Sequence, residues 1–139
     1  MNSETDKIDE IERLVWGFEN CTLQPSMFHH RDHLAVTLWY QIQDPDSDPV
    51  ERFRASLHKF ADHYQLKAYN ETITIFWVRI VNRHFKQCVN EQSFPALLES
   101  LIERYGDSQF IFNYFSKAHL MSDEAKSQWV DPDLKPLDF

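Results

Sequence analysis

Residues 30–43 read HRDHLAVTLWYQIQ, and this stretch decides the fold. When it is wound as a helix, at about 100° per residue, leucine, alanine, isoleucine and tryptophan side chains cover one broad side, and valine and tyrosine extend round the other. The remaining narrow strip holds His30, His33, Thr37 and Gln41, without a lysine or glutamate. A helix that is apolar nearly all round is typically buried. We therefore expect this helix to lie among several others.

Apolar side chains recur at three- and four-residue spacing elsewhere in the chain. This spacing predicts further helices over residues 5–20, 48–64, 71–90 and 93–105, a short helical piece over 109–115 and a last helix over 122–129. Residues 72–78 are rich in strand-favouring residues, but the apolar stripe that continues beyond them favours a helix. Asp48 and Ser122 are expected helix caps at N-termini, and Gly106 is expected to close the helix before it.

The fold class predicted from these patterns is all-α. Residues 1–139 are expected to form a single domain, an irregular bundle of about five main helices plus one or two short ones. Residues 130–139 contain two prolines and should form an extended tail. Packing on the bundle is the favoured role of this tail, with Val130, Leu134, Leu137 and Phe139 as apolar anchors, and a lid over a pocket is the alternative.

Composition excludes several classes of function. The chain has only two glycines, so it lacks glycine-rich phosphate loops, dinucleotide fingerprints and the hydrolase nucleophile elbow. Its net charge of −8 argues against nucleic acid and anionic membranes as partners, and Arg79, Arg83 and Lys86 are interpreted as a solvated helix face. Cys21 and Cys88 are expected to be free thiols. Without an apolar leader or spanning segment, the expected location is the cytoplasm.

One group of polar residues suggests chemistry. If the helix over residues 30–43 is buried, His30 and His33 need partners, and helical winding places Glu71 and Thr74 on the core-facing stripe of the helix over residues 71–90. Neutral imidazoles and a carboxylate suit a divalent transition metal, so His30, His33 and Glu71 are candidate metal ligands. Without a metal, the same three residues are candidate catalytic acids and bases of a small-molecule enzyme.

Two other classes of function remain open. The chain could be a non-catalytic module whose aromatic interior binds a small ligand or whose surface binds a protein. Alternatively, the His and Glu side chains could form a structural cluster of satisfied hydrogen bonds that ties the two helices together.

Three blocks of the sequence resemble a family of small bacterial proteins of uncharacterised function. Residues 28–34 read FHHRDHL, residues 69–74 read YNETIT and residues 129–137 read WVDPDLKPL, which match HxxHL, ETIT and WVxPDLxPL blocks of that family. The resemblance spans about residues 18–137. It implies an all-helical fold and a site at His30, His33, Glu71 and Thr74.

The chain departs from the family pattern at Asn70, where relatives often carry a histidine. This departure argues against a three-histidine site. Around the two histidines and Glu71, the candidate ligand-binding residues are Thr37, Asn70, Thr74 and Trp77.

Overall fold

The computed structural model describes residues 3–88 and 93–139. These ranges are helical and contain no strand, which confirms the all-α fold. The elements in chain order are α1 (Ser3–Glu19), η1 (Pro25–Met27), α2 (His30–Gln43), α3 (Pro49–Tyr64), α4 (Glu71–Cys88), α5 (Phe94–Tyr105), η2 (Ser108–Asn113), α6 (Lys117–Leu120) and α7 (Asp123–Ser127).

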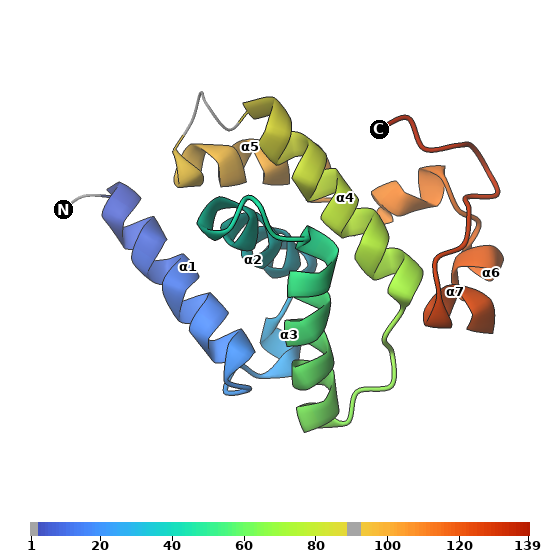
Figure 1. The fold of residues 1–139 in the computed structure, drawn as a ribbon, viewed down its shortest axis with the longest axis horizontal. Coiled ribbons are helices and arrows are strands. Elements are labelled where there is room, and N and C mark those ends of the chain that lie inside the picture. The colour runs from blue at the N-terminus through green and yellow to red at the C-terminus, as the bar shows by residue number, and fades with distance from the viewer. Residues whose placement is uncertain (1–2, 89–92) are drawn as a thin grey trace.

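Helix α2 is the centre of the bundle, as its sequence predicts. It packs against α1, α3, α4 and α5, which surround it (Figure 1). Leu34, Val36 and Leu38 are at most 1% exposed, although they point to different sides of the helix. Because neighbours cover α2 on several sides, Thr37 and Gln41 of its narrow strip are also buried, whereas His30 and His33 are partly exposed.

The helix boundaries follow local chemistry. The Asp48 carboxylate accepts hydrogen bonds from the backbone N–H groups of Val50 and Glu51, which caps α3. The strand-favouring residues 72–78 lie inside α4, as the stripe predicts. Gly106 caps α5, but with φ of −70° it is not left-handed. Glycine is required there because a Cβ atom would lie 2.4 Å from the Ile102 carbonyl oxygen. The predicted last residues of the fourth helix, 89–90, lie outside the described residues.

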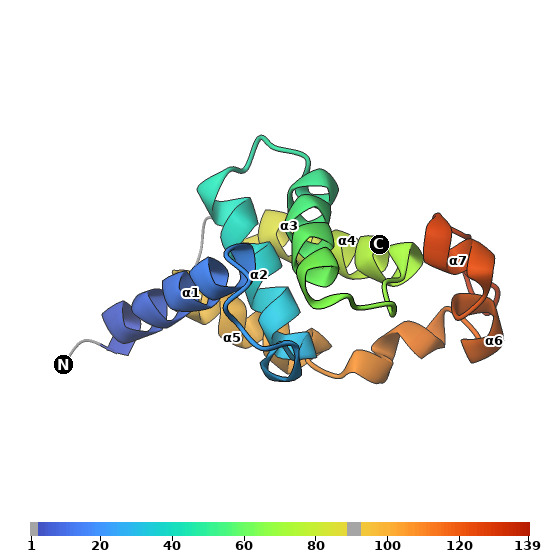
Figure 2. The same ribbon diagram turned by 90° about the horizontal axis from the view of Figure 1, so that it is seen from below.

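The C-terminal segment continues away from the α1 end of the bundle (Figure 2). The Leu134 backbone N–H donates to the Tyr114 carbonyl, the Tyr114 hydroxyl donates to Asp138, and the Phe139 ring packs 5.6 Å from the Phe76 ring. Val130 is buried, but Leu134 is 55% exposed and is therefore not an anchor. The tail attaches at that point through its backbone instead. Helices η1 and α6, which the sequence spacing does not predict, are both shorter than five residues.

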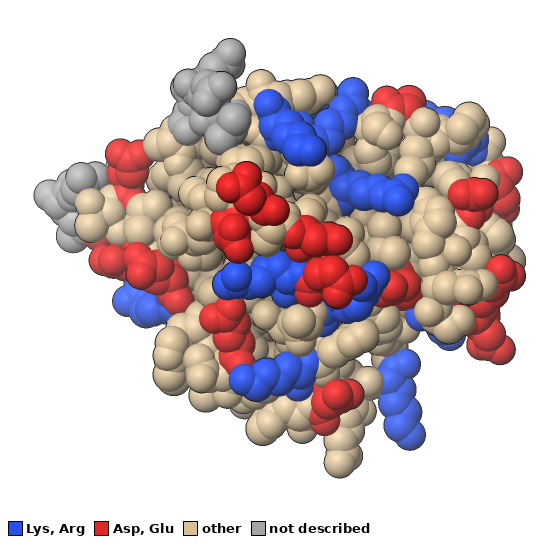
Figure 3. Space-filling model, in the orientation of Figure 1, with Lys and Arg blue, Asp and Glu red and all other residues tan. Residues whose placement is uncertain are grey.

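Charged residues of both signs are interspersed on the face shown in Figure 3. The face of α4 expected to be solvated is partly covered by the tail. The Arg79 guanidinium lies 4.7 Å from the centre of the Trp129 ring, and that of Arg83 lies 5.8 Å from the Phe139 ring. Within the described ranges, no helix has the length and apolar character needed to cross a membrane.

Candidate ligand-binding site

A pocket of about 410 Å³ lies between α2, α4 and η2, beside the end of α6. Five of the seven predicted site residues line it from α2 and α4, and η2 and its neighbours form the other side. The lining residues are His30, His33, Leu34, Thr37, Phe53, Ile73, Thr74, Trp77, Val78, Ser108, Gln109, Ile111, Phe112, Leu120 and Met121. The two segments that the sequence singles out therefore meet at one cavity.

His33 lines this pocket without a hydrogen bond to its side chain from any described residue. Its ring stacks on the Phe28 ring at 4.2 Å and lies 5.7 Å from the Phe53 ring, so two aromatic side chains set its position. Burial, and secondarily the nearby His30, lowers the pKa of His33 to about 4. The imidazole is therefore neutral at pH 7. Within the described part of the chain, neither ring nitrogen has a hydrogen-bond partner.

His30 is held more firmly. Its Nε2 lies 3.0 Å from the Tyr105 carbonyl oxygen, and its ring meets the Trp77 ring edge-on at 4.3 Å. A carbonyl oxygen only accepts hydrogen bonds, so Nε2 carries the proton and Nδ1 of the neutral ring is an acceptor. Burial lowers the pKa of His30, although the bond to Tyr105 and the charge of Asp107 oppose this shift. The bond links the start of α2 to the end of α5.

The two threonines in the pocket use their hydroxyl protons within their own helices. The Thr37 hydroxyl donates to the His33 carbonyl at 2.8 Å, and the Thr74 hydroxyl donates to the Asn70 carbonyl at 2.9 Å. Each hydroxyl oxygen keeps acceptor capacity. Trp77, 9% exposed, supplies an apolar wall.

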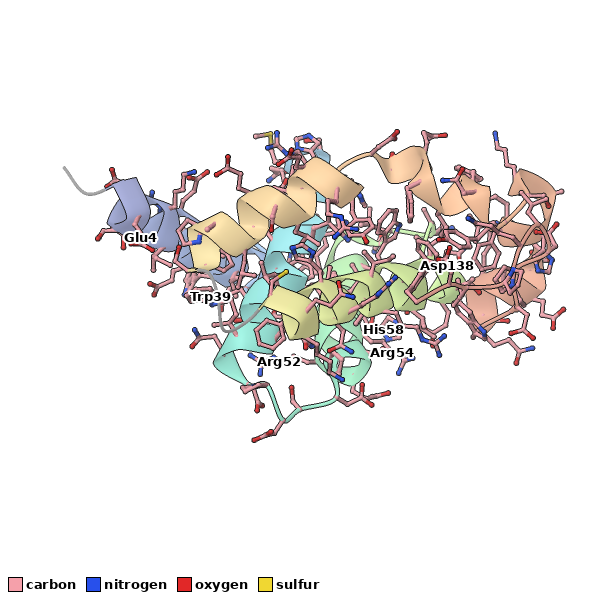
Figure 4. The ribbon with its side chains drawn as sticks, turned by 90° about the horizontal axis from the view of Figure 1, so that it is seen from above. Glu4, Trp39, Arg52, Arg54, His58 and Asp138 are labelled. Carbon is pink, nitrogen blue, oxygen red and sulfur yellow. The ribbon has the colours of Figure 1, made fainter. Side chains whose placement is uncertain are left out.

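Glu71 does not join the histidines, which corrects the predicted site. Its carboxylate accepts hydrogen bonds from Arg54 Nε at 3.1 Å and Arg54 Nη2 at 2.6 Å, and from the Tyr69 hydroxyl. Burial raises the pKa of Glu71, but the hydrogen bonds from Tyr69 and Arg54 outweigh this effect and lower it. Arg54 lies on α3 one turn before His58 (Figure 4). The planar guanidinium of Arg54 binds the Glu71 carboxylate through two parallel hydrogen bonds, so the Glu71 side chain is directed toward α3.

The proposed metal ligands therefore do not form a ligand set. His30 and His33 line one pocket, but the third predicted ligand is bound to Arg54. Residues 3–88 and 93–139 contain no group of three His, Cys, Asp or Glu side chains placed to hold a metal ion. These residues do not fit a metal centre.

Asn70 is buried, and both ends of its side-chain amide bond to other parts of the fold. Its Nδ2 donates to the Leu120 carbonyl at 2.8 Å, and its Oδ1 accepts from the Ile73 backbone N–H at 3.0 Å. The side chain therefore caps α4 and joins it to α6. It lies outside the pocket of His30 and lines a smaller one next to it.

The wall contributed by η2 was not predicted as part of the site. Ser108, Gln109, Ile111 and Phe112 line the pocket, yet nothing in their spacing relates them to α2. Arg54 was also missed as the partner of Glu71. Its position on the same helix face as Glu51 and His58 is the signal that could have indicated a charged contact from α3. Comparison with known protein families, curated proteins and solved structures finds no match for the chain.

Proposed function

We propose that the chain binds a small, uncharged, largely apolar molecule in the pocket between α2, α4 and η2, with His33 as the group that recognises it. The observation that carries this proposal is a neutral imidazole without a hydrogen bond in a cavity of about 410 Å³. His33 is only partly buried and lines this pocket, so a molecule in the pocket can reach its unpaired ring nitrogens. A ligand that supplies the missing partner gains affinity from it.

The lining of the pocket favours an uncharged ligand. Among the described residues around the pocket there is no Lys, Arg, Asp or Glu. A charged ligand would lose its hydration there without gaining a counter-ion, whereas an uncharged one bears no such cost. The volume falls within the range of about 300–1,000 Å³ that is usual for small-molecule sites. Aliphatic and aromatic walls favour a ligand that is mostly hydrocarbon.

The titration of His33 favours binding over proton transfer. A general base works best when its pKa lies near the working pH. Because the pKa of His33 is about 4, its imidazole is a weak base at pH 7. We therefore assign it a hydrogen-bonding role. The structural-cluster alternative has weaker support, because the carboxylate it requires is bound to Arg54 and His33 has no bond to α4 among the described residues.

A methyl NMR titration with diethyl ketone tests the proposal. The ketone carbonyl accepts one hydrogen bond and both arms are apolar, so binding should shift the methyl signals of Val78 and Ile111 in the pocket wall. His33→Phe keeps a flat ring between Phe28 and Phe53 but removes the donor. A neutral hydrogen bond contributes about 0.5–1.5 kcal/mol, so the affinity should fall about two- to thirteenfold.

His63→Phe is the matched control, because His63 is exposed on α3 and lines neither pocket. It should leave the affinity for the ketone unchanged. Propionate, which resembles one arm of the ketone but carries a charge, should bind at least tenfold more weakly. The proposal fails if the Val78 and Ile111 signals do not respond to the ketone, or if propionate binds equally well.

A further inference from the structure

A second pocket adjoins the first one at His33. It has a volume of about 230 Å³ and lies between α3, the segment before α4 and the first turn of α4. Three residues line both pockets, namely His33, Ile73 and Thr74. The two cavities therefore adjoin along a shared wall formed by these three side chains.

The size and polarity of the second pocket suit part of a ligand rather than a whole one. Its volume is below the range of about 300–1,000 Å³ that is usual for independent small-molecule sites. Among the described residues that line it, none is Lys, Arg, Asp or Glu. Apart from His33 and Thr74, which it shares with the first pocket, its polar members are already used, because Tyr69 donates to Glu71 and the amide of Asn70 bonds to Leu120 and Ile73. What remains is an apolar surface.

The wall between the pockets carries the hydrogen-bonding groups. His33 has a free donor and a free acceptor, and Thr74 has acceptor capacity because its proton goes to Asn70. The ring that stacks on His33, Phe28, lines the second pocket, while Phe53 lines the first. His33 is thus held between an aromatic side chain of each cavity.

We propose that the ligand is elongated and occupies both pockets, with a carbonyl or hydroxyl group at His33 and Thr74 and an apolar arm on each side. This inference rests on the proposed function and adds the class of ligand. A carbonyl accepts from the His33 N–H, and a hydroxyl also donates to the imidazole nitrogen or to the Thr74 oxygen. Each methylene that enters an apolar pocket tightens binding about fourfold, since burying it contributes about 0.8 kcal/mol.

Dibutyl ketone, compared with diethyl ketone, tests the inference by methyl NMR. Ala61 and Ala68 line the second pocket only, whereas Val78 and Ile111 line the first only. Both ketones should shift the Val78 and Ile111 signals. Only dibutyl ketone should also shift those of Ala61 and Ala68, because the first two carbons of the second arm lie beside the wall and only the two further carbons of a butyl arm reach these residues. The two methylenes that its second arm adds there should contribute about fifteenfold to its tighter binding.

Ala68→Trp should fill the second pocket from its exposed rim. The variant should lose about fifteenfold in affinity for dibutyl ketone and nothing for diethyl ketone. Ala61→Leu fills the same pocket from α3 and should change the two affinities as Ala68→Trp does. Its NMR spectrum shows whether the variant is folded. Ala55→Trp, at an exposed position of α3 outside both pockets, is the control and should change neither affinity.

The outcomes separate the two proposals. If both ketones shift Val78 and Ile111 but dibutyl ketone leaves Ala61 and Ala68 unchanged, the two-pocket inference is overturned and the proposed function stands. If the affinity for dibutyl ketone survives in both filled variants, the inference is overturned as well. If neither ketone shifts Val78 or Ile111, the proposed function itself fails.

Discussion

Acidification should destabilise the fold through His33. The pKa of this imidazole is about 4 in the folded protein, against an ordinary value of 6.5. Between these two pH values, the unfolded chain therefore binds a proton at His33 and the folded chain does not. The free energy of unfolding falls as the pH drops from 6.5, and the loss is complete below about pH 4. A difference of about 2.5 pH units corresponds to about 3 kcal/mol.

Urea denaturation at pH 7.5 and pH 4 measures this loss. For the parent chain and for His33→Phe, we measure how much the free energy of unfolding decreases from pH 7.5 to pH 4. The two decreases are then compared. Any effect of the substitution that is independent of pH then cancels. The loss should be smaller by about 3 kcal/mol in His33→Phe. His63→Phe, at an exposed histidine, should show the same loss as the parent. Equal losses in all three proteins would refute the burial of a neutral imidazole at His33.

Three further substitutions test the assignments made around the site. Glu71→Gln weakens the bond to Arg54, in which the Arg54 side chain is 23% exposed and the Glu71 side chain 16% exposed. It should cost about 1–2 kcal/mol of stability. It should not change the affinity for diethyl ketone, because Glu71 does not line the pocket. Thr72→Val removes the hydroxyl that lies 2.8 Å from the Ala125 carbonyl and accepts from the Val130 N–H, and should cost about 2 kcal/mol in a urea titration. Asn70→Asp places a carboxylate oxygen against the Leu120 carbonyl in a buried position and should cost about 3 kcal/mol at pH 7, with part of the loss recovered at pH 4.

Matched controls separate these effects from general sensitivity. Glu51→Gln, at a 67% exposed carboxylate, should stay within about 0.5 kcal/mol of the parent, as should Thr22→Val at an exposed threonine. Loss of ketone binding in Glu71→Gln, with the fold intact, would contradict the placement of Glu71 outside the pocket. A neutral effect of Thr72→Val would contradict the link between α4 and the C-terminal segment.

The sequence predicted the fold best where one segment carried a strong pattern. Residues 30–43 are apolar nearly all round, and this property alone indicates a central helix because no exposed face is left. The stripe of residues 78–85 likewise outweighed the strand-favouring residues before it, since tertiary packing along a regular stripe overrides intrinsic propensity. Short elements such as α6 were missed because four residues do not repeat a helical period.

The site was predicted in part, and the reason lies in Glu71. Helical winding identified the core-facing stripe of α4, and Thr74 and Trp77 line the pocket. At the first turn of α4, however, the inward direction faces α3 as well as α2. Which of them attracts the carboxylate depends on Arg54, and the packing of α3 against α4 cannot be obtained from either helix alone. The contribution of η2 to the pocket could not be predicted for the same reason.

The most direct test of the central claim is a crystal structure of the chain soaked in dibutyl ketone at a saturating concentration. We expect electron density for the ketone between α2 and α4, with its carbonyl oxygen within hydrogen-bond distance of a His33 ring nitrogen. An empty pocket, or a ketone bound only elsewhere on the surface, would contradict it.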